Sequence, residues 1–231
     1  GSGRIDVVNE ILPDDAYSVE HYPRIRHATR DLLNAAARKH MIHAMVEVDV
    51  TDARSALRRI GRETGETPSF TGLVIACCAR AVARNPRVHA YRTIRNRLVL
   101  FNDVDVSVTV ERMVDRQSQV LPTIVRAANR KSVREIHDEI RSAQTTPVER
   151  AGVFSSIRLS LMIPPLVRRL VFRLLDRMPR LMKERAGTIM VTSVGMFGGG
   201  AGWGIPIGSH TLNVTVGGVV QRPRLVLELR D

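Results

Sequence analysis

Glycine is concentrated in one part of the chain, the segment from Gly187 to Val220. Six glycines fall within ten residues there: Gly195, Gly198, Gly199, Gly200, Gly202 and Gly204. Without side chains the backbone can turn tightly, and a large group can approach it closely. Strands are predicted on either side, from Thr188 to Ser193 and from Thr211 to Val216. A flexible linker would be equally rich in glycine, but interleaved residues such as Phe197 and Trp203 favour a structured loop beside a site.

Phosphate binding is the first chemistry that such a loop suggests, and its spacing excludes it. The glycines at positions 198, 200, 202 and 204 alternate as G-x-G-x-G-x-G, so that neither G-x-G-x-x-G nor G-x-x-x-x-G-K-[ST] can be placed. Pro206 and a predicted strand follow the loop, whereas a pyrophosphate site needs the N-terminus of a helix. The sequence therefore predicts neither a dinucleotide-binding nor a P-loop site.

Two runs of this segment, GTIMVTSVGMFG from Gly187 and HTLNVTVGGVVQRP from His210, resemble the catalytic domain of the acyltransferase component of 2-oxo acid dehydrogenase complexes. Earlier runs agree in order: HMIHAMVEVDVTDARSALR, ARAVARNPRVHAY and RAANRKSVREIHDEIRSA. The resemblance covers roughly residues 40 to 228. It implies the α+β fold of that family, which is the chloramphenicol acetyltransferase-like two-layer sandwich with a mixed sheet and helices on one face.

The resemblance also implies a role for Thr192. Acyl transfer between thioesters and thiols needs hydrogen-bond donors directed at the developing oxyanion. By the family's [ST]-[NS]-[LV]-G segment, Thr192 holds the hydroxyl that stabilises this oxyanion. Taken without the resemblance, Thr192 is a β-branched residue of a strand.

Acyl transfer also needs a general base to form the thiolate. In the family this base is the histidine of an H-x-x-x-D-G motif, which does not occur in the sequence. We expect the natural reading frame to continue past Asp231 to that motif; the alternative is a protein without the base. His43, His89 and His210 could be considered as substitutes, but none has a catalytic spacing, and ordinary surface or core roles are expected for them.

Composition favours a single globular enzyme domain with an anionic small-molecule partner. The 231 residues include 44% hydrophobic and 25% charged residues, and the net charge is +12. The positive charge is spread along the chain and aromatic residues make up only 4%, which argues against nucleic acid as a partner. The pyrophosphate and 3′-phosphate of coenzyme A suit a basic pocket better.

Neither a metal site nor a membrane span is expected. The histidines are scattered and no C-x-x-C occurs, which gives no support for metal binding. Cys77 and Cys78 are adjacent in an apolar helical run, and we interpret them as small buried residues in a reducing cytoplasm. No uninterrupted apolar run reaches the roughly 18 residues of a membrane span, and the cytoplasm is the expected location.

The chain is divided into an expression scar (residues 1–3), an N-terminal arm and helix (4–39) and the catalytic domain (40–231). Further helices are predicted from Asp52, capped by Thr51 and ended by Gly65, from Ser69 to Asn85, and from Ser132 with a Glu135 capping box to Ala143. The other expected elements are a helix over 28–40 and strands over 44–50, 97–101, 105–110 and 120–125. Strands mixed with a few long helices indicate an α+β sandwich.

Residues 154–183 depart from the family, whose members have a shorter and more polar stretch there. Leucines at 166, 170, 174 and 175 recur at helical spacing, with arginines at 168, 169, 173 and 177 among them. We favour a helix that packs on its own core or on a neighbouring subunit. The alternatives are a basic amphipathic helix on an anionic membrane and a cofactor-binding role.

The resemblance implies an acyltransferase that moves an acyl group between coenzyme A and a thiol such as dihydrolipoamide. It also implies a homotrimer or a larger assembly of trimers, because the family builds its site between subunits, and a lipoyl-bearing protein as a possible partner. Two alternatives stay open at this point: a non-catalytic trimeric scaffold of the same fold, and a peripheral membrane protein that uses residues 154–183.

Overall fold

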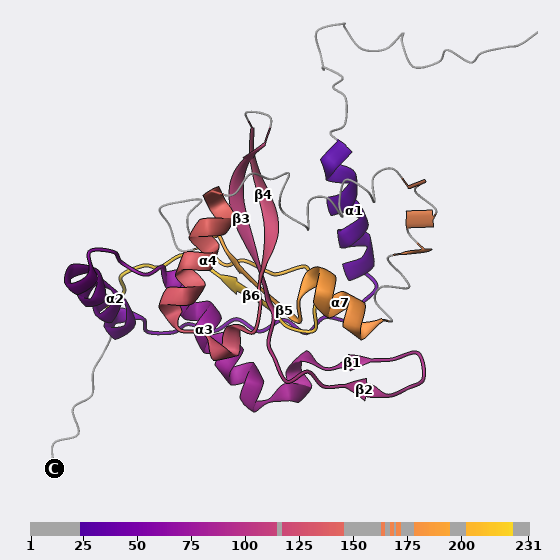
Figure 1. The fold of residues 1–231 in the computed structure, drawn as a ribbon, viewed down its shortest axis with the longest axis horizontal. Coiled ribbons are helices and arrows are strands. Elements are labelled where there is room, and N and C mark those ends of the chain that lie inside the picture. The colour runs from indigo at the N-terminus through magenta and orange to yellow at the C-terminus, as the bar shows by residue number, and fades with distance from the viewer. Residues whose placement is uncertain are drawn as a thin grey trace, which may run out of the picture.

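The computed structural model describes residues 24–114, 117–145, 163–164, 167–168, 170–171, 178–194 and 202–223 (Figure 1). In chain order the described elements are α1 (Arg24–Ala36), α2 (Thr51–Thr64), α3 (Phe70–Arg84), η1 (Pro86–His89), β1 (Tyr91–Arg92), β2 (Leu98–Val99), β3 (Val106–Val114), β4 (Gln117–Val125), η2 (Ala128–Arg130), α4 (Val133–Thr145), α7 (Pro179–Ala186), β5 (Ile189–Ser193) and β6 (Asn213–Val216). None of the described helices is long and apolar enough to cross a membrane.

The main sheet is mixed and has the order β4-β3-β5-β6. β3 and β4 form an antiparallel hairpin, while β5 runs parallel to β3 and β6 runs parallel to β5. Pro122 lies in β4 at the edge of the sheet, where its missing N–H costs no ladder bond. A second, antiparallel pair, β1 and β2, extends to one side of the main sheet (Figure 1). The mixed sheet confirms the predicted fold class.

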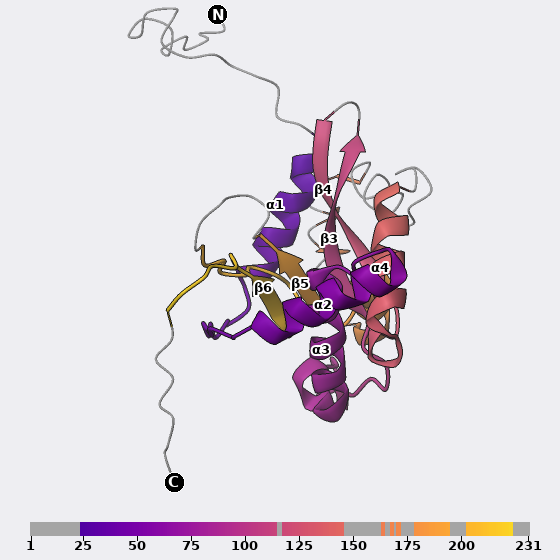
Figure 2. The same cartoon turned by 90° about the vertical axis from the view of Figure 1, so that its left-hand side faces the viewer.

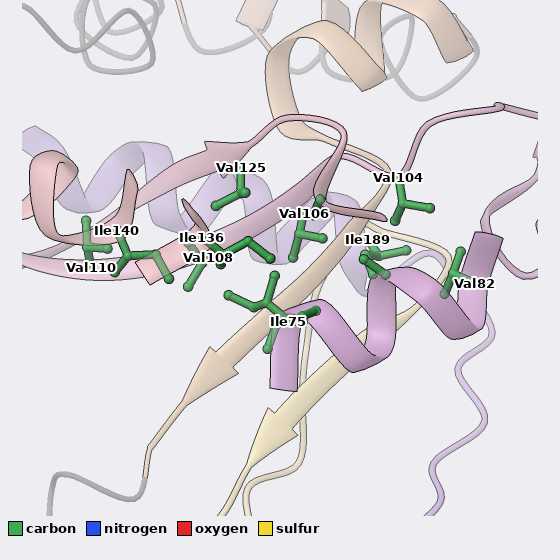
Figure 3. Packing of buried hydrophobic residues seen from close by; sticks show 14 residues of the cluster. Ile75, Val82, Val104, Val106, Val108, Val110, Val125, Ile136, Ile140 and Ile189 are labelled. Atoms are coloured by element: carbon green, nitrogen blue, oxygen red, sulfur yellow. The ribbon is translucent and has the colours of Figure 1, made fainter. Parts of the chain in front are cut away.

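One face of the main sheet packs against α3 and α4 and forms the hydrophobic core; Figure 2 shows these elements from the side. Val106, Val108 and Val110 of β3 and Ile189 and Val191 of β5 are buried there. They meet a set of helical side chains that Figure 3 shows from close by: Ile75, Ala79 and Val82 of α3 and Ile136 and Ile140 of α4. Because successive strand residues point to opposite faces, the polar residues between these valines and isoleucines face the other way. The alternation in β3 and β5 therefore determines which residues lie on the face opposite the core, where a site can form.

The start of α3 and the start of α4 are set by side chains that the sequence identifies. The Gly72 N–H donates to Ser69 Oγ at 3.0 Å, as expected of an N-cap residue. Ser132 and Glu135 form the predicted capping box, since each side chain accepts a hydrogen bond from the other residue's backbone N–H.

The prediction that Thr51 caps α2 is wrong. The helix already includes Thr51, and the backbone N–H of Thr51 donates to Asp49 Oδ1 at 3.0 Å. An aspartate two residues earlier therefore satisfies this exposed N–H, and the Thr51 hydroxyl is not needed for it. The predicted end at Gly65 is confirmed, with φ +78° at that residue.

The prediction of a strand over residues 44–50 is also wrong, because the structure has no strand there. Alternation of apolar and polar residues gives the segment one apolar side, but a strand needs a partner, and no described segment pairs with it. Its apolar side chains are left in solvent, with Ile42 98%, Val46 71% and Val48 70% exposed. The expected helix over 28–40 is present, but it begins at Arg24 and ends at Ala36.

Most of residues 154–183 lies outside the described residues, and the part that is described agrees with the favoured packing on the chain itself. Arg168 is buried and forms an ion pair with the buried Asp31 of α1, so the segment does pack on its own chain. Leu170, by contrast, is exposed. A buried arginine needs a buried carboxylate, whereas a leucine can remain at the surface at smaller cost.

The two adjacent cysteines do not share one environment. Cys77 is exposed, which corrects the expectation that both are buried, because neighbouring residues of a helix point about 100° apart. Cys78 is half-buried, and burial, with a smaller contribution from Cys77, raises the pKa of its thiol above the ordinary value.

Candidate functional site

Thr192 lies on β5, on the face of the sheet that points away from α3 and α4. Val191 beside it is fully buried in the core, so the strand alternation places Thr192 on the opposite face, where it is half-buried. Its Oγ1 atom lies 2.8 Å from Thr109 Oγ1 on β3, within hydrogen-bond distance. On the other side, Thr215 of β6 is its register partner. A transverse row of three threonine hydroxyls therefore crosses β3, β5 and β6.

The glycine-rich connection is not a simple turn, because β5 and β6 are parallel. The chain has to return along the sheet before β6 begins. Its described part, from residue 202, starts beside the end of β6, where the Gly218 N–H donates to the Gly202 carbonyl at 3.1 Å. Residues 195–201 lie outside the described part of the chain.

Gly204 and Gly208 lie against the same face as Thr192. A Cβ atom at Gly204 would stand 2.3 Å from Thr215 Cγ2, and one at Gly208 would stand 2.2 Å from Asn213 Oδ1. These glycines are needed because the returning backbone runs directly over the side chains of β6. The close approach predicted from the glycine content is therefore made, at these two positions, by the protein's own strand.

Alternate residues of the same connection carry large apolar side chains into solvent. Trp203, Ile205 and Ile207 are 53%, 58% and 60% exposed, respectively. The segment 40–50, which exposes Val46 and Val48, is tied to the region after β6 by an ion pair between Glu47 and Arg222 at 2.7 Å. We call the residues Ile42, Val46, Val48, Trp203, Ile205 and Ile207 the apolar rim.

Two of the three histidines considered as bases are engaged in structural hydrogen bonds. His89 Nε2 lies 3.1 Å from the Phe101 carbonyl and His210 Nε2 lies 2.7 Å from the Ala186 carbonyl, so that each nitrogen acts as a donor. Both side chains are buried, and burial lowers the pKa of His89 below its ordinary value. His43 is exposed. The structure brings none of the three into the threonine row.

Glu66, His137 and Asp138 form the cluster of possible metal ligands in the described part of the chain. The buried His137 accepts the Ser69 N–H at Nδ1, so its Nε2 carries the proton and donates to Glu66 Oε1 at 3.1 Å. This bond, followed by the charge of Arg134, lowers the pKa of Glu66. A metal on Nε2 would require an imidazolate ring, and both carboxylates already form ion pairs with Arg134. The cluster suits a structural clamp between α4 and the start of α3 better than a metal.

Sequence reasoning missed a buried network at the N-terminal ends of β3 and β5. The Asp105 carboxylate accepts hydrogen bonds from Arg126 Nη1 and from the Ala127 N–H, both at 2.9 Å. Arg126 also donates to the last carbonyls of α7, at Lys183 and Glu184. The Thr188 N–H donates to the Asp105 carbonyl at 2.7 Å. A lone aspartate before an apolar strand gave no specific signal for this arrangement, and Thr109 gave none for its bond to Thr192.

Comparison with known proteins places the chain among acyltransferases. The family model described as 2-oxoacid dehydrogenases acyltransferase (catalytic domain) matches residues 14–151. No curated protein gives a significant match.

Solved structures of similar fold include a probable dihydrolipoamide acetyltransferase from Listeria monocytogenes, with a TM-score of 0.60 and 19% identity over 91% of this chain and 79% of that one. The cubic core of the pyruvate dehydrogenase multienzyme complex has a TM-score of 0.60 and 15% identity over 94% and 81% of the two chains. The Azotobacter vinelandii dihydrolipoamide acetyltransferase, whose catalytic mechanism was investigated at a serine, a histidine and an asparagine, has a TM-score of 0.61 and 14% identity over 94% and 81%.

Proposed function

Because the chain belongs to the 2-oxoacid dehydrogenases acyltransferase family, whose model covers more than half of it, we propose that it transfers an acyl group between coenzyme A and a thiol such as dihydrolipoamide. The reaction exchanges one thioester for another. The thiol loses its proton to a base, its sulfur attacks the thioester carbonyl, and the carbonyl oxygen takes the negative charge. Collapse of this tetrahedral intermediate expels the first sulfur as a thiolate, which recovers the proton.

Thr192 is the residue to which we assign stabilisation of the oxyanion. The observation that carries this assignment is its place in the V-T-S-V-G sequence run that begins in β5, where Thr192 is half-buried on the face that the core leaves free. A hydroxyl held in such a position is already oriented when charge develops on the substrate oxygen. The family model ends at residue 151, so the role of Thr192 rests on its motif and its position in the fold.

The base is the second requirement, and no histidine of the described chain is assigned to it. His89 and His210 are buried away from the threonine row, and each is held by a hydrogen bond from Nε2 to a backbone carbonyl, so neither is placed to take a proton from a thiol at Thr192. The family's H-x-x-x-D-G motif does not occur in the sequence. The base is therefore left unassigned, and tests of activity are made on the natural gene product.

The direct test is the rate of acyl transfer from acetyl-coenzyme A to dihydrolipoamide. Thr192→Ala should lower kcat about 10²-fold, the scale for loss of one oxyanion donor. KM should change little, because the hydroxyl acts on charge that exists only in the transition state. Thr192→Ser keeps the donor and should retain most of the activity. An unchanged kcat in a folded Thr192→Ala protein would show that Thr192 is only a strand residue.

We also propose a homotrimer or a multiple of three, with the apolar rim in the contact between subunits. One support is the apolar rim, because six exposed apolar side chains are more than scattered surface residues usually account for. The other is the cubic core found among the proteins of similar fold. Burial of an aspartate in such a contact is costly, so Ile207→Asp should reduce the mass measured by light scattering to that of a monomer. Ile94→Asp, at a similarly exposed isoleucine in the β1-β2 hairpin, is the matched control and should leave the mass unchanged.

Tests of the two proposals together distinguish an enzyme from the non-catalytic scaffold that the sequence analysis left open. A scaffold would keep the trimeric mass but give no acyl transfer with any thiol acceptor. A protein that carries a lipoyl group is the natural acceptor to test beside free dihydrolipoamide. If a trimer forms and transfers acetyl groups to neither, the scaffold is the better description.

A further inference from the structure

Thr109 and Thr192 are joined by a side-chain hydrogen bond between neighbouring strands. Their Oγ1 atoms are 2.8 Å apart, and either hydroxyl can be the donor. The register of β3 and β5 pairs Val108 with Val191, so the two threonines follow at the same level and on the same face. We infer that Thr109 is a positioning residue for acyl transfer, with its hydroxyl donating to Thr192 Oγ1. This inference rests on the proposed function.

The direction of the hydrogen bond decides whether Thr109 orients the Thr192 hydroxyl or takes up the proton that Thr192 would donate to the oxyanion. A hydroxyl has one proton to donate and two lone pairs that accept. If Thr192 donated to Thr109, its only proton would be unavailable to the substrate oxygen. If Thr109 donates, the Thr192 proton is free to point at the oxyanion, and its oxygen is held in place by the bond that it accepts.

The surroundings of Thr109 favour the second direction once an oxyanion is present. Thr109 makes no other side-chain hydrogen bond in the described part of the chain, so its proton has no competing protein acceptor. The Thr192 proton is drawn to the strongest acceptor nearby, which is the negative oxygen. The result is a chain of two hydroxyls, from Thr109 to Thr192 to the oxyanion, in which each bond polarises the next.

Thr215 provides a matched comparison, because it is the register partner of Thr192 on the other side. Its hydroxyl is also buried, yet it has no hydrogen-bond partner among the described residues. Of the two threonines that flank Thr192, one is bonded to it and the other is not. Replacement of either by valine removes a hydroxyl and keeps the shape, so the two variants differ in the bond alone.

The experiment measures kcat and KM for acetyl transfer to dihydrolipoamide in the full natural gene product. Thr109→Val should lower kcat roughly 3- to 10-fold with KM unchanged, the scale for one hydrogen bond that acts in the transition state. Thr109→Ser should restore the wild-type rate, and Thr215→Val, which breaks no hydrogen bond to Thr192, should lower kcat less than Thr109→Val does. In a Thr192→Ala background Thr109→Val should have no further effect, because the group it orients is absent. Thr109→Ala is a second hydroxyl-free variant, should the valine not fold.

The outcomes separate this inference from the function on which it rests. A full effect of Thr192→Ala with no effect of Thr109→Val overturns the role of Thr109 alone. That role is equally overturned if Thr109→Val raises kcat, or if its effect persists undiminished in the Thr192→Ala background. A natural protein without acyl transfer, or one that is indifferent to Thr192→Ala, overturns the proposed function and the positioning role with it.

Discussion

The two ends of strand β5 are built in opposite ways. At its N-terminal end, the closed end, Thr188, Asp105 and Arg126 form a network in which the carboxylate and the adjoining backbone groups are hydrogen-bonded. At the other end, the open end, Thr192 is half-buried, and Trp203, Ile205 and Ile207 of the connection, which belong to the apolar rim, are exposed. Satisfied buried polar groups make a region rigid, whereas exposed apolar groups gain by meeting something else. The closed end therefore stabilises the fold, whereas the proposed acyl transfer and the proposed subunit contact both use residues of the open end.

The largest effect is expected at the closed end, from Asp105→Ala. The substitution removes a buried carboxylate that accepts from Arg126 and from the Ala127 N–H, and should lower the free energy of unfolding by about 3 kcal/mol. Urea denaturation measures this change. The control is Asp103→Ala, which breaks the more exposed pair with Arg130 and should cost about 1 kcal/mol or less. Equal costs for the two would refute the distinction between a buried network and a surface pair.

A pair of glycines tests the two ends directly. A Cβ atom at Gly187 would lie 2.8 Å from the Asp105 carbonyl oxygen, and φ there is +84°. A Cβ atom at Gly204 meets side chains instead, the nearest being the methyl group of Thr215. Backbone cannot move aside as a side chain can, so Gly187→Ala should cost about 2–3 kcal/mol and Gly204→Ala about 1–2 kcal/mol.

A second substitution distinguishes the two glycine positions further. Thr215→Ser removes the methyl group that the new Cβ at position 204 would meet, and should recover stability in Gly204→Ala but not in Gly187→Ala. Thermal unfolding of the four variants gives the answer. Rescue of both glycine variants, or of neither, would show that the two contacts do not differ as described.

The smallest effect concerns pH and His89, which lies beside the closed end. Burial lowers the pKa of His89 below its ordinary value of 6.5. The unfolded chain therefore takes up the proton first, so that stability is complete above about pH 6.5 and falls as the pH drops below it. The slope due to this one proton is at most about 1.4 kcal/mol per pH unit.

Urea unfolding between pH 5 and pH 8 would show this slope, and His89→Gln should flatten it. Glutamine can still donate to the Phe101 carbonyl but does not titrate in this range. His43→Gln, at an exposed histidine, is the matched control. A slope that is the same in wild type and His89→Gln would assign the acid sensitivity to other groups.

The sequence by itself determined what depends on neighbours along the chain. The Ser69 cap and the Ser132 and Glu135 box act over three residues, so residue types at fixed spacing were enough to predict them. The strands expected over 105–110 and 188–193 are likewise present, as β3 and β5. The family resemblance identified Thr192 as the residue to consider in β5.

Tertiary structure alone decided which distant groups meet. Thr109 and Thr192 are 83 residues apart in the chain, and Asp31 and Arg168 are 137 apart. No local preference encodes such pairs, because they depend on sheet order and on the packing of whole elements. The segment 44–50 shows the converse, since its alternation is typical of a strand but no described strand lies beside it. A strand is stabilised by hydrogen bonds to a second segment, and a sequence pattern specifies only one of the two.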